Sequence, residues 1–147
     1  MKISTKGRYG LRAMLDLAIH TSSGSHVSLS SIAENQDVSV SYLEQVFSAL
    51  RKSGLVKSIK GAQGGYTLGD DPGNITVGSI LRALEGEMKV VEEDDTNPYD
   101  NMQLCIKKNV WDRMDYCINS IIDSITLEDM IEEYNKLNGK NNYMYYI

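Results

Sequence analysis

The chain has 147 residues, of which 41% are hydrophobic and 24% are charged, and its formal net charge is −5. This composition excludes collagen-like, fully disordered and disulfide-scaffold proteins, and two cysteines, Cys105 and Cys117, are typical of a reducing cytoplasm. The sequence has neither the roughly 20 consecutive apolar residues of a membrane helix nor the apolar core of a secretory signal. We therefore expect a soluble cytoplasmic protein of one domain, or of one small domain with an appendage.

The net charge conceals a difference between the two halves of the chain. Residues 1–69 carry eight basic and four acidic residues, whereas residues 70–147 carry seven basic and sixteen acidic residues. A basic N-terminal half can meet a polyanion while the acidic half stays away from it. An uneven spread of solubilising charge explains the same numbers equally well.

The N-terminal part of the chain predicts two helices. Apolar residues recur at helical spacing from about Thr5 to Thr21, and the Ser-Ser-Gly-Ser run at 22–25 ends this helix. A second, short helix starts near Ser28 and stops at the polar residues 35–37.

The strongest helical pattern follows this polar break. Its inward positions fall at i, i+3, i+4 and i+7 and are Leu43, Val46, Phe47 and Leu50. Ser41 and Glu44 have the spacing of a capping box, and Gly54 suits the position just beyond the helix end.

A hairpin and a further helix come next. Residues 55–60 and 66–68 predict two short strands joined by the flexible turn 61–65. A helix then begins at Thr76 with the same apolar spacing as before. From residue 87 to residue 101 the pattern fails, and an acidic run marks a linker or variable loop.

The last third of the chain predicts a long helix with the seam of a coiled coil. Apolar residues spaced by seven, three and four positions form this seam, namely Leu104, Trp111, Met114, Ile118, Ile121 and Ile125. Further apolar residues lie on another side, so the helix requires more than one neighbour. We expect these neighbours to be the N-terminal half of the same chain and a second copy of the chain.

Thr126 opens a short final helix, with Asp129 at the spacing of a capping box. The residues after Gly139 show no periodicity. The predicted organisation is a first domain at 1–86, an acidic variable loop at 87–101, dimerisation helices at 102–137 and a mobile tail at 138–147.

Three helices followed by a two-stranded hairpin are the order of a winged helix-turn-helix, whose second paired helix enters the major groove of DNA. The predicted fold is therefore α+β: mainly helical, with a small hairpin wing and a long C-terminal dimerisation helix. The third helix then exposes polar side chains, of which Gln45 can pair with an adenine and Glu44 with a cytosine amino group. Lys57 and Lys60 lie on the hairpin, whose glycines let the backbone approach a phosphate or a groove wall. The alternative interpretation is a solvated helix face beside a loose turn.

Several segments are similar to the Rrf-two family of bacterial transcription regulators. They are residues 1–10, 41–45, 50–56 and 64–66, and the resemblance extends over the whole chain. It implies a winged helix that binds promoter DNA as a homodimer built on the long C-terminal helix. From the exposed helix face and the resemblance together, the expected DNA-binding residues are Lys6, Arg8, Tyr9, Ser41, Tyr42, Glu44, Gln45, Arg51 and Lys60.

The resemblance leaves two kinds of signal open. Family members with an iron–sulfur cluster carry three closely spaced cysteines before the long helix, whereas residues 87–101 contain none. Cys105 matches the last of these cysteines, but Lys108 stands where a histidine ligand is expected. Cys117 follows twelve residues later, which is roughly 18 Å along a helix. We expect no cofactor; pairing of either cysteine across a dimer stays open.

Neither a metal site nor an active site is expected from the remaining residues. His20 and His26 lack a partner at ligand spacing, which favours surface or capping roles. The sequence has no nucleophile with an evident base and no phosphate-binding loop that opens a helix, so we do not expect an enzyme.

The C-terminal residues are similar to the branch of the family that represses genes of cysteine and sulfur metabolism. The similarity lies in residues 124–129 and 143–147, and it implies cysteine synthase as a co-regulator. Tyr145, Tyr146 and Ile147 are then the partner-binding residues, because aromatic anchors and a terminal carboxylate suit insertion into an active site. Alternatively, the tail packs on its own dimer. The predicted function is a homodimeric repressor of cysteine metabolism, and the alternative is an iron–sulfur or thiol-sensing regulator of the same family.

Overall fold

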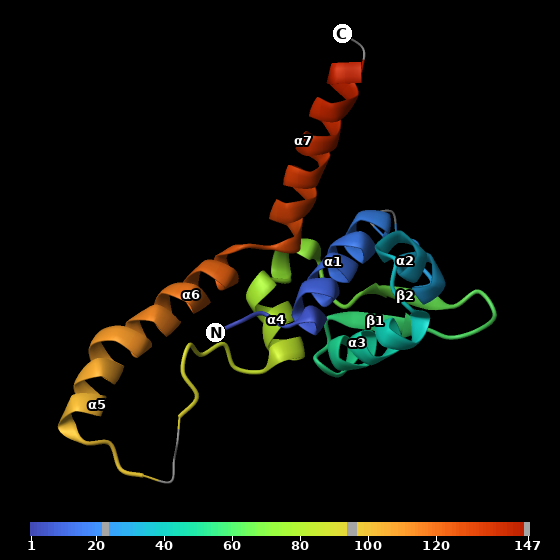
Figure 1. Ribbon diagram of the computed structural model, residues 1–147. Coiled ribbons are helices and arrows are strands. Elements are labelled where there is room, and N and C mark those ends of the chain that lie inside the picture. Colours follow the sequence, from blue (N-terminus) through green and yellow to red (C-terminus); the bar gives the residue numbers. More distant parts are fainter. Residues whose placement is uncertain (22–23, 94–96, 146–147) are drawn as a thin grey trace.

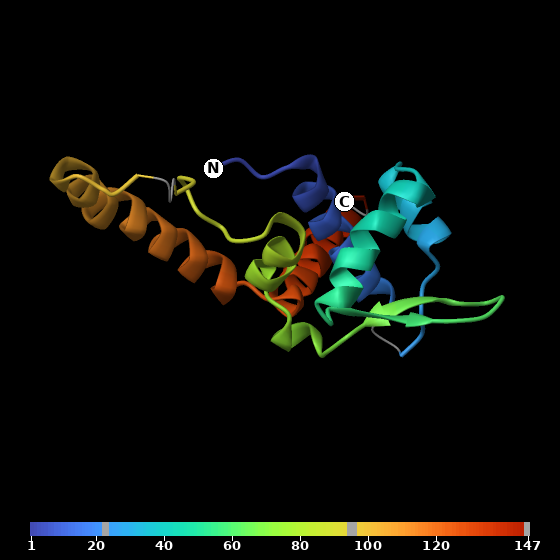
Figure 2. The same cartoon turned by 90° about the horizontal axis from the view of Figure 1, so that it is seen from below.

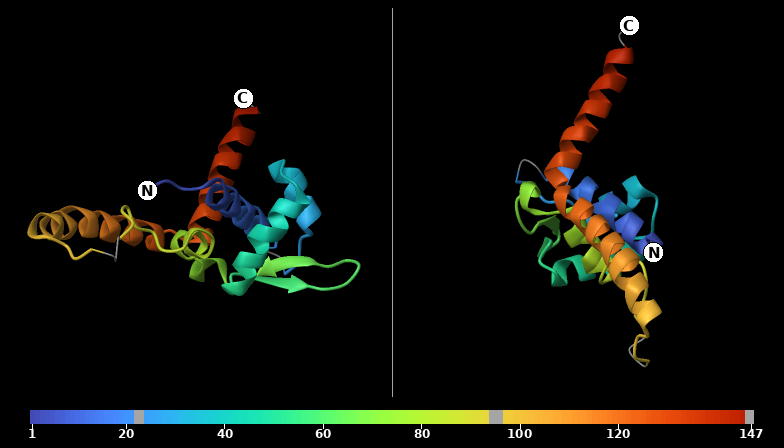
Figure 3. Two further views of the ribbon diagram at one scale, coloured as in Figure 1. Left: turned by 60° about the horizontal axis from the view of Figure 1, so that its bottom comes forward. Right: turned by 90° about the vertical axis from the view of Figure 1, so that its left-hand side faces the viewer.

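The computed structural model describes residues 1–21, 24–93 and 97–145, with side chains to residue 139. Its elements in chain order are α1 (Thr5–His20), α2 (Leu29–Gln36), α3 (Val40–Lys52), β1 (Val56–Ile59), β2 (Gly65–Leu68), the short 3₁₀ helix η1 (Pro72–Asn74), α4 (Val77–Glu85), α5 (Asn101–Ile106), the π-helical segment η2 (Lys107–Trp111), α6 (Asp112–Ser124) and α7 (Leu127–Tyr145). Helices α1 to α4 and the hairpin form a body (Figure 1). We call the continuous helical run of α5, η2 and α6 the arm; it leaves the body on one side, while α7 projects in a different direction (Figure 3). The predicted α+β winged-helix architecture is confirmed.

The core of the body is formed by the apolar faces of α1, α3 and α4. Met14, Phe47 and Ile80, one from each helix, are fully buried, as are all four inward positions predicted for α3. Each such side chain contributes about 1.5–3 kcal/mol of burial free energy. Leu127, the first residue of α7, is also fully buried, so the base of α7 belongs to the same core.

Two glycines allow α1 to approach α4 closely. A Cβ atom on Gly10 would lie 2.1 Å from Cδ1 of Leu84, and a Cβ on Gly7 would collide with the carboxylate of Glu85. That carboxylate accepts hydrogen bonds from the backbone N–H and the hydroxyl of Ser4, the N-cap of α1. The N-terminal residues are thereby fixed to α4.

The start of α3 differs from the prediction. Ser39, not Ser41, is the N-cap, and its hydroxyl accepts a hydrogen bond from the N–H of Tyr42. Val38 and Leu43 then occupy the two positions of a hydrophobic staple: Leu43 lies in the core, and Val38 packs against it. Because the staple sets where the chain enters the helix, Ser41 lies inside the first turn. The capping box predicted from Thr126 and Asp129 is confirmed at α7, and the structure also shows a capping box of Thr76 with Ser79 at α4.

The arm is joined to the body through Arg82 of α4. Its guanidinium donates two hydrogen bonds to Asp123, at 2.7 and 2.9 Å, and one to Asn119, at 2.7 Å. The hydrogen bonds between Arg82 and Asp123 lower the pKa of Asp123 and raise that of Arg82. Gly78 permits the close approach, because a Cβ there would lie 2.0 Å from the Asp123 carboxylate.

The predicted coiled-coil seam is interrupted within the arm. A π turn holds roughly one residue more than an α turn, which offsets the faces on its two sides by about 100°. Since η2 separates Leu104 from Met114, Leu104 does not continue the predicted line. Ile125 directly follows α6 in an extended conformation and packs with Ile122 against a second apolar cluster of the same chain. Leu104 is therefore offset around the arm from Met114, Ile118 and Ile121, and the dimer contacts of the six seam residues stay a prediction.

The final helix is longer than predicted. Instead of a short helix followed by an irregular tail, α7 continues to Tyr145. Residues 127–145 contain no proline, and Gly139 alone costs a helix only about 1 kcal/mol. Tyr145 is thus the last helical residue, and Tyr146 and Ile147 lie outside the described residues. Among the described helices, none combines the length and the apolar character needed to cross a membrane.

Candidate nucleic-acid interface

Helices α2 and α3 form a helix-turn-helix. Asp37, directly after α2, has a left-handed conformation with φ of 53°, and α3 starts three residues later. Because the apolar positions of α3 are buried, its opposite face is open to solvent. The exposed side chains on this face are Ser41, Glu44, Gln45, Arg51 and Lys52. The structure therefore brings hydroxyl, carboxylate, amide and basic groups together on one open face, and groups of these kinds can contact base edges and phosphates.

Tyr42 does not lie on this open face as predicted. Its side chain is half-buried against the core, and its hydroxyl is buried without a hydrogen-bond partner among the described residues. Its ring contacts that of Tyr9 edge to face, with centroids 6.3 Å apart. In this structure the two tyrosines join the start of α3 to α1, and a DNA contact by the Tyr42 hydroxyl requires its side chain to turn outward.

The N-terminal residues predicted to contact DNA lie on the first turn and a half of α1. Arg8 is exposed, and its guanidinium donates a 3.3 Å hydrogen bond to the hydroxyl of Thr5. Lys6 is half-buried. Since Tyr9 packs on Tyr42, these residues lie near the start of α3.

The wing is a two-stranded antiparallel hairpin. Val56 pairs with Leu68 and Ile59 pairs with Gly65, so β2 begins one residue earlier than predicted. The hairpin follows the C-terminal end of α3, and its turn reaches out beyond the body (Figure 2). Lys57 and Lys60 are exposed on it. The basic half of the sequence thus carries both the helix-turn-helix and the wing.

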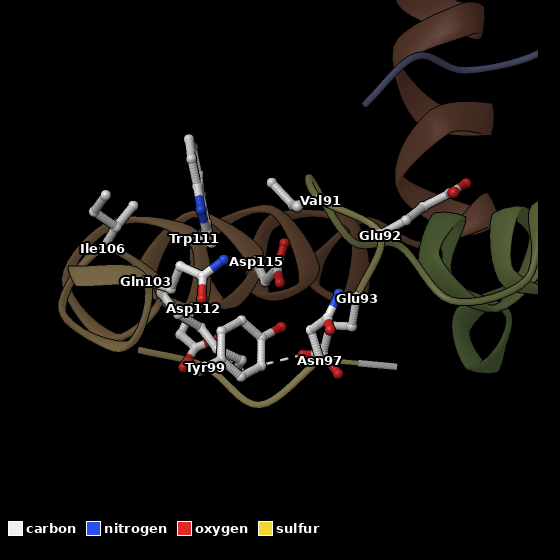
Figure 4. Close-up of a pocket in the computed structure, with 11 residues that line it drawn as sticks. Val91, Glu92, Glu93, Asn97, Tyr99, Gln103, Ile106, Trp111, Asp112 and Asp115 are labelled. Carbon is white, nitrogen blue, oxygen red and sulfur yellow. Dashed lines mark hydrogen bonds and ion pairs between the residues drawn. The ribbon is translucent and has the colours of Figure 1, made fainter. Parts of the chain in front are cut away.

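A pocket of about 320 Å³ lies on the arm, between the helical run and residues 91–93, 97 and 99 of the preceding segment (Figure 4). The ammonium group of Lys107 contacts Asp112 at 2.8 Å and Glu93 at 3.4 Å, and the hydrogen bond to Asp112 raises its pKa. Asp115 accepts a 2.8 Å hydrogen bond from the backbone of Val90. The carboxylates of this pocket therefore fasten the preceding loop to the arm.

The helix-turn-helix, the wing and the arm together are found in a known protein family. Residues 3–133 match the model of the Rrf2 family, described as an iron-dependent transcriptional regulator. The chain belongs to the Rrf2 family. It is accordingly a transcriptional regulator with a DNA-binding winged helix, and not an enzyme.

Individual Rrf2 relatives match most or all of the chain. The regulator CymR of Bacillus subtilis strain 168 is 45% identical over 148 aligned positions, which cover 100% of both chains. The solved structure of CymR (YrzC), the global cysteine regulator of B. subtilis, covers 90% of this chain and 98% of its own, with 44% identity and a TM-score of 0.76. The structure of T. potens IscR covers 91% and 88%, with 46% identity and a TM-score of 0.71.

The description of the Rrf2 family as iron-dependent raises the question of whether this member can hold iron. Cys105 and Cys117 are both exposed on the arm. Over the described part of the chain, no three histidine, cysteine, aspartate or glutamate side chains gather so that they could bind a metal ion. His20 contacts Asp16 at 2.7 Å, and His26 is bonded to a backbone carbonyl. The residues described in this Rrf2 chain therefore do not fit an iron site.

A hydrogen-bond network that joins α1 to α2 was not predicted from the sequence. Asp16 lies almost fully buried in α1 and accepts a 2.9 Å hydrogen bond from the Gln36 amide at the end of α2. Gln36 in turn accepts a 2.8 Å hydrogen bond from Arg12. These bonds fix α2 to α1. An acidic residue at a position of the apolar helix face, as Asp16 is in α1, is the sequence feature that could have predicted this network.

Proposed function

We propose that this Rrf2 protein represses genes of cysteine metabolism by binding their promoters, which places its action in the cytoplasm, where bacterial promoters lie. The observation that carries this proposal is the full-length match to B. subtilis CymR, which leaves no part of either chain uncovered. The solved CymR is described as a global cysteine regulator. The exposed polar face of α3 and the lysines of the wing supply the chemistry that promoter binding requires.

The repressor acts as a homodimer through its arm. The arm exposes apolar side chains that a monomer would leave in water: Met114 is 43% exposed and Ile121 is 60% exposed, and Trp111 lies on the same run. Two arms packed together remove these side chains from water. A two-fold dimer also presents two α3 helices to two half-sites of one operator.

Cysteine synthase is the proposed co-regulator, and the C-terminal residues are its binding segment. Support comes from α7, whose residues 132–139 are exposed and which projects from the body (Figure 1) and ends at Tyr145. When cysteine is plentiful, the free synthase binds Tyr145, Tyr146 and Ile147 and stabilises the DNA-bound dimer. When its precursor accumulates, the precursor occupies the synthase and the complex dissociates. Such a partner shifts DNA occupancy only to the extent that its affinity for the DNA-bound dimer differs from its affinity for the free dimer.

A gel-shift titration tests this proposal. The probe is DNA from upstream of cysteine-biosynthesis genes, with a random duplex of equal length as competitor. We expect the protein to prefer the upstream DNA, and cysteine synthase to tighten this binding at micromolar or lower concentration. A copy that lacks Ile147 should bind the DNA alike but should not respond to the synthase. Equal binding of both duplexes would contradict the proposal that the protein is a promoter-specific repressor. An unchanged response to the synthase in the copy without Ile147 would contradict the proposal that the C-terminal residues bind the synthase.

An iron–sulfur or thiol-sensing regulator is the second candidate, favoured by the 46% identity to T. potens IscR. The single chain offers Cys105 and Cys117 as its cysteines. A cluster would therefore need ligands from both copies of a dimer.

Anaerobic purification distinguishes this candidate from the first. We expect a colourless protein with less than stoichiometric iron, because the described residues provide no metal-binding group. A coloured protein whose absorption disappears when Cys105 is replaced by serine would support the cluster and contradict this expectation.

A further inference from the structure

A histidine of the α1–α2 loop contacts the turn of the wing. Nε2 of His26 lies 2.5 Å from the backbone carbonyl oxygen of Gln63, which is 37 residues away in the sequence. Gln63 lies within the turn 60–64 that joins β1 to β2. The promoter-binding residues proposed above do not include His26, and it lies on a different segment from all of them.

The next residue of the loop is bonded to the wing as well. Val27 and Tyr66 exchange two backbone hydrogen bonds, of 2.9 and 2.7 Å, so that the loop forms an additional antiparallel bridge to β2. Gly65 allows this approach, because a Cβ there would lie 2.3 Å from the carbonyl oxygen of Val27. Tyr66 also packs against Phe47 of the core, with ring centroids 4.9 Å apart. The base of the wing is therefore fixed to the body.

The turn of the wing has few restraints of its own. It contains Gly61 and Gly64, and Gly61 has a positive φ of 119°. Glycines lose more conformational entropy than other residues when they are ordered. Within the described structure, one bond inside the turn joins Gly64 to Gly61 at 3.0 Å, and the bond from His26 connects the turn to the body.

We propose that His26 is a positioning residue for DNA recognition: its ring fixes the wing turn so that Lys60 and the side chain of Gln63 meet the groove beside the one that α3 enters. This proposal rests on the proposed promoter binding. Lys60 and Gln63 are exposed at the turn, where a basic and an amide side chain suit a phosphate and a minor-groove base edge. Ordering the turn before binding removes part of the entropy cost that the complex otherwise carries.

The hydrogen bond also defines the state of the ring. A carbonyl oxygen accepts and does not donate, so Nε2 must carry the proton. Both the neutral Nε2–H tautomer and the imidazolium ion satisfy this requirement. Nitrogen chemical shifts of His26 in the free protein should therefore report a protonated Nε2.

The experiment compares His26→Ala and His26→Gln with the wild type. The probe is a duplex that the wild-type protein enriches from a random pool, and hydrogen exchange of the Gly64 and Gly65 amides is measured without DNA. We expect His26→Ala to speed this exchange and to weaken binding of the enriched duplex by about three- to tenfold, the range of one net hydrogen bond. Glutamine, which keeps an N–H donor, should restore part of both effects.

A double-mutant cycle with Lys60→Ala shows whether His26 acts through the wing. If it does, His26→Ala should cost little further affinity once Lys60 is replaced. His20→Ala is the matched control, because His20 is bonded to Asp16 of α1 and not to the wing; its effect should add fully to that of Lys60→Ala. Unchanged amide exchange in His26→Ala, or full additivity with Lys60→Ala, would overturn the proposal. If no duplex is enriched, promoter binding itself fails, while amide exchange still tests the bond.

Discussion

Replacement of Gln45 by alanine is expected to weaken binding of a specific duplex by about ten- to a hundredfold and to leave binding of a random duplex almost unchanged. A side chain that makes a bidentate contact with an adenine contributes about 1–3 kcal/mol of discrimination against other bases. Gln45 is exposed on α3, on the face opposite the buried Leu43 and Phe47. Its loss should therefore affect the reading of sequence and leave the protomer folded.

Fluorescence anisotropy with both duplexes, over a range of salt concentrations, measures this effect. Arg51→Ala is the comparison variant, because an exposed arginine at the end of α3 suits a phosphate contact. It should weaken binding of both duplexes alike. It should also make the slope of log affinity against log salt concentration shallower by about the contribution of one phosphate contact. If Gln45→Ala lowers the affinity for both duplexes equally, Gln45 does not read a base.

The second large effect is expected at the arm. Ile121→Lys should convert the homodimer into a monomer, because two lysines would enter the apolar contact between the arms, once from each copy. A central apolar residue of an interface contributes about 2 kcal/mol or more, so the dimer dissociation constant should rise by at least about a hundredfold. DNA affinity should fall with it, since the two half-sites are then bound separately.

Analytical ultracentrifugation and a melting curve test this prediction together. Ile121 is 60% exposed in the protomer, so the melting of the isolated protomer should change little. Ser120→Lys adds the same charge at the neighbouring exposed position and serves as the control. A dimer that survives Ile121→Lys, or one that both variants disrupt alike, would contradict the proposed interface.

The body of the protein follows from its sequence to a large extent because burial repeats at fixed spacing. The predicted inward positions of α3 and α4 recur every three to four residues and all are buried, and the glycine-rich turn marks the hairpin. The errors arise where local rules permit two outcomes. Ser39 and Ser41 can both cap a helix, and the packing of Val38 against the core selects Ser39.

The arm and α7 were predicted less well for a different reason. The coiled-coil pattern assumes an uninterrupted α-helix, and nothing in the residues 107–111 marks a π turn. Likewise, a polar segment without proline is compatible with a tail or with a helix, and α7 shows the helix. The inward turn of Tyr42 depends on Tyr9, which is 33 residues away, so spacing along α3 could not show it.

The Arg82 contact between α4 and the arm has a consequence for the geometry of the operator. Rotation of the arm about its axis would break three hydrogen bonds to Asn119 and Asp123. In the proposed homodimer this joint fixes the separation and the relative orientation of the two α3 helices. One additional base pair between half-sites rotates the second by about 35° around the DNA axis. A rigid joint cannot follow that rotation, so the length of the operator spacer becomes part of what the protein recognises.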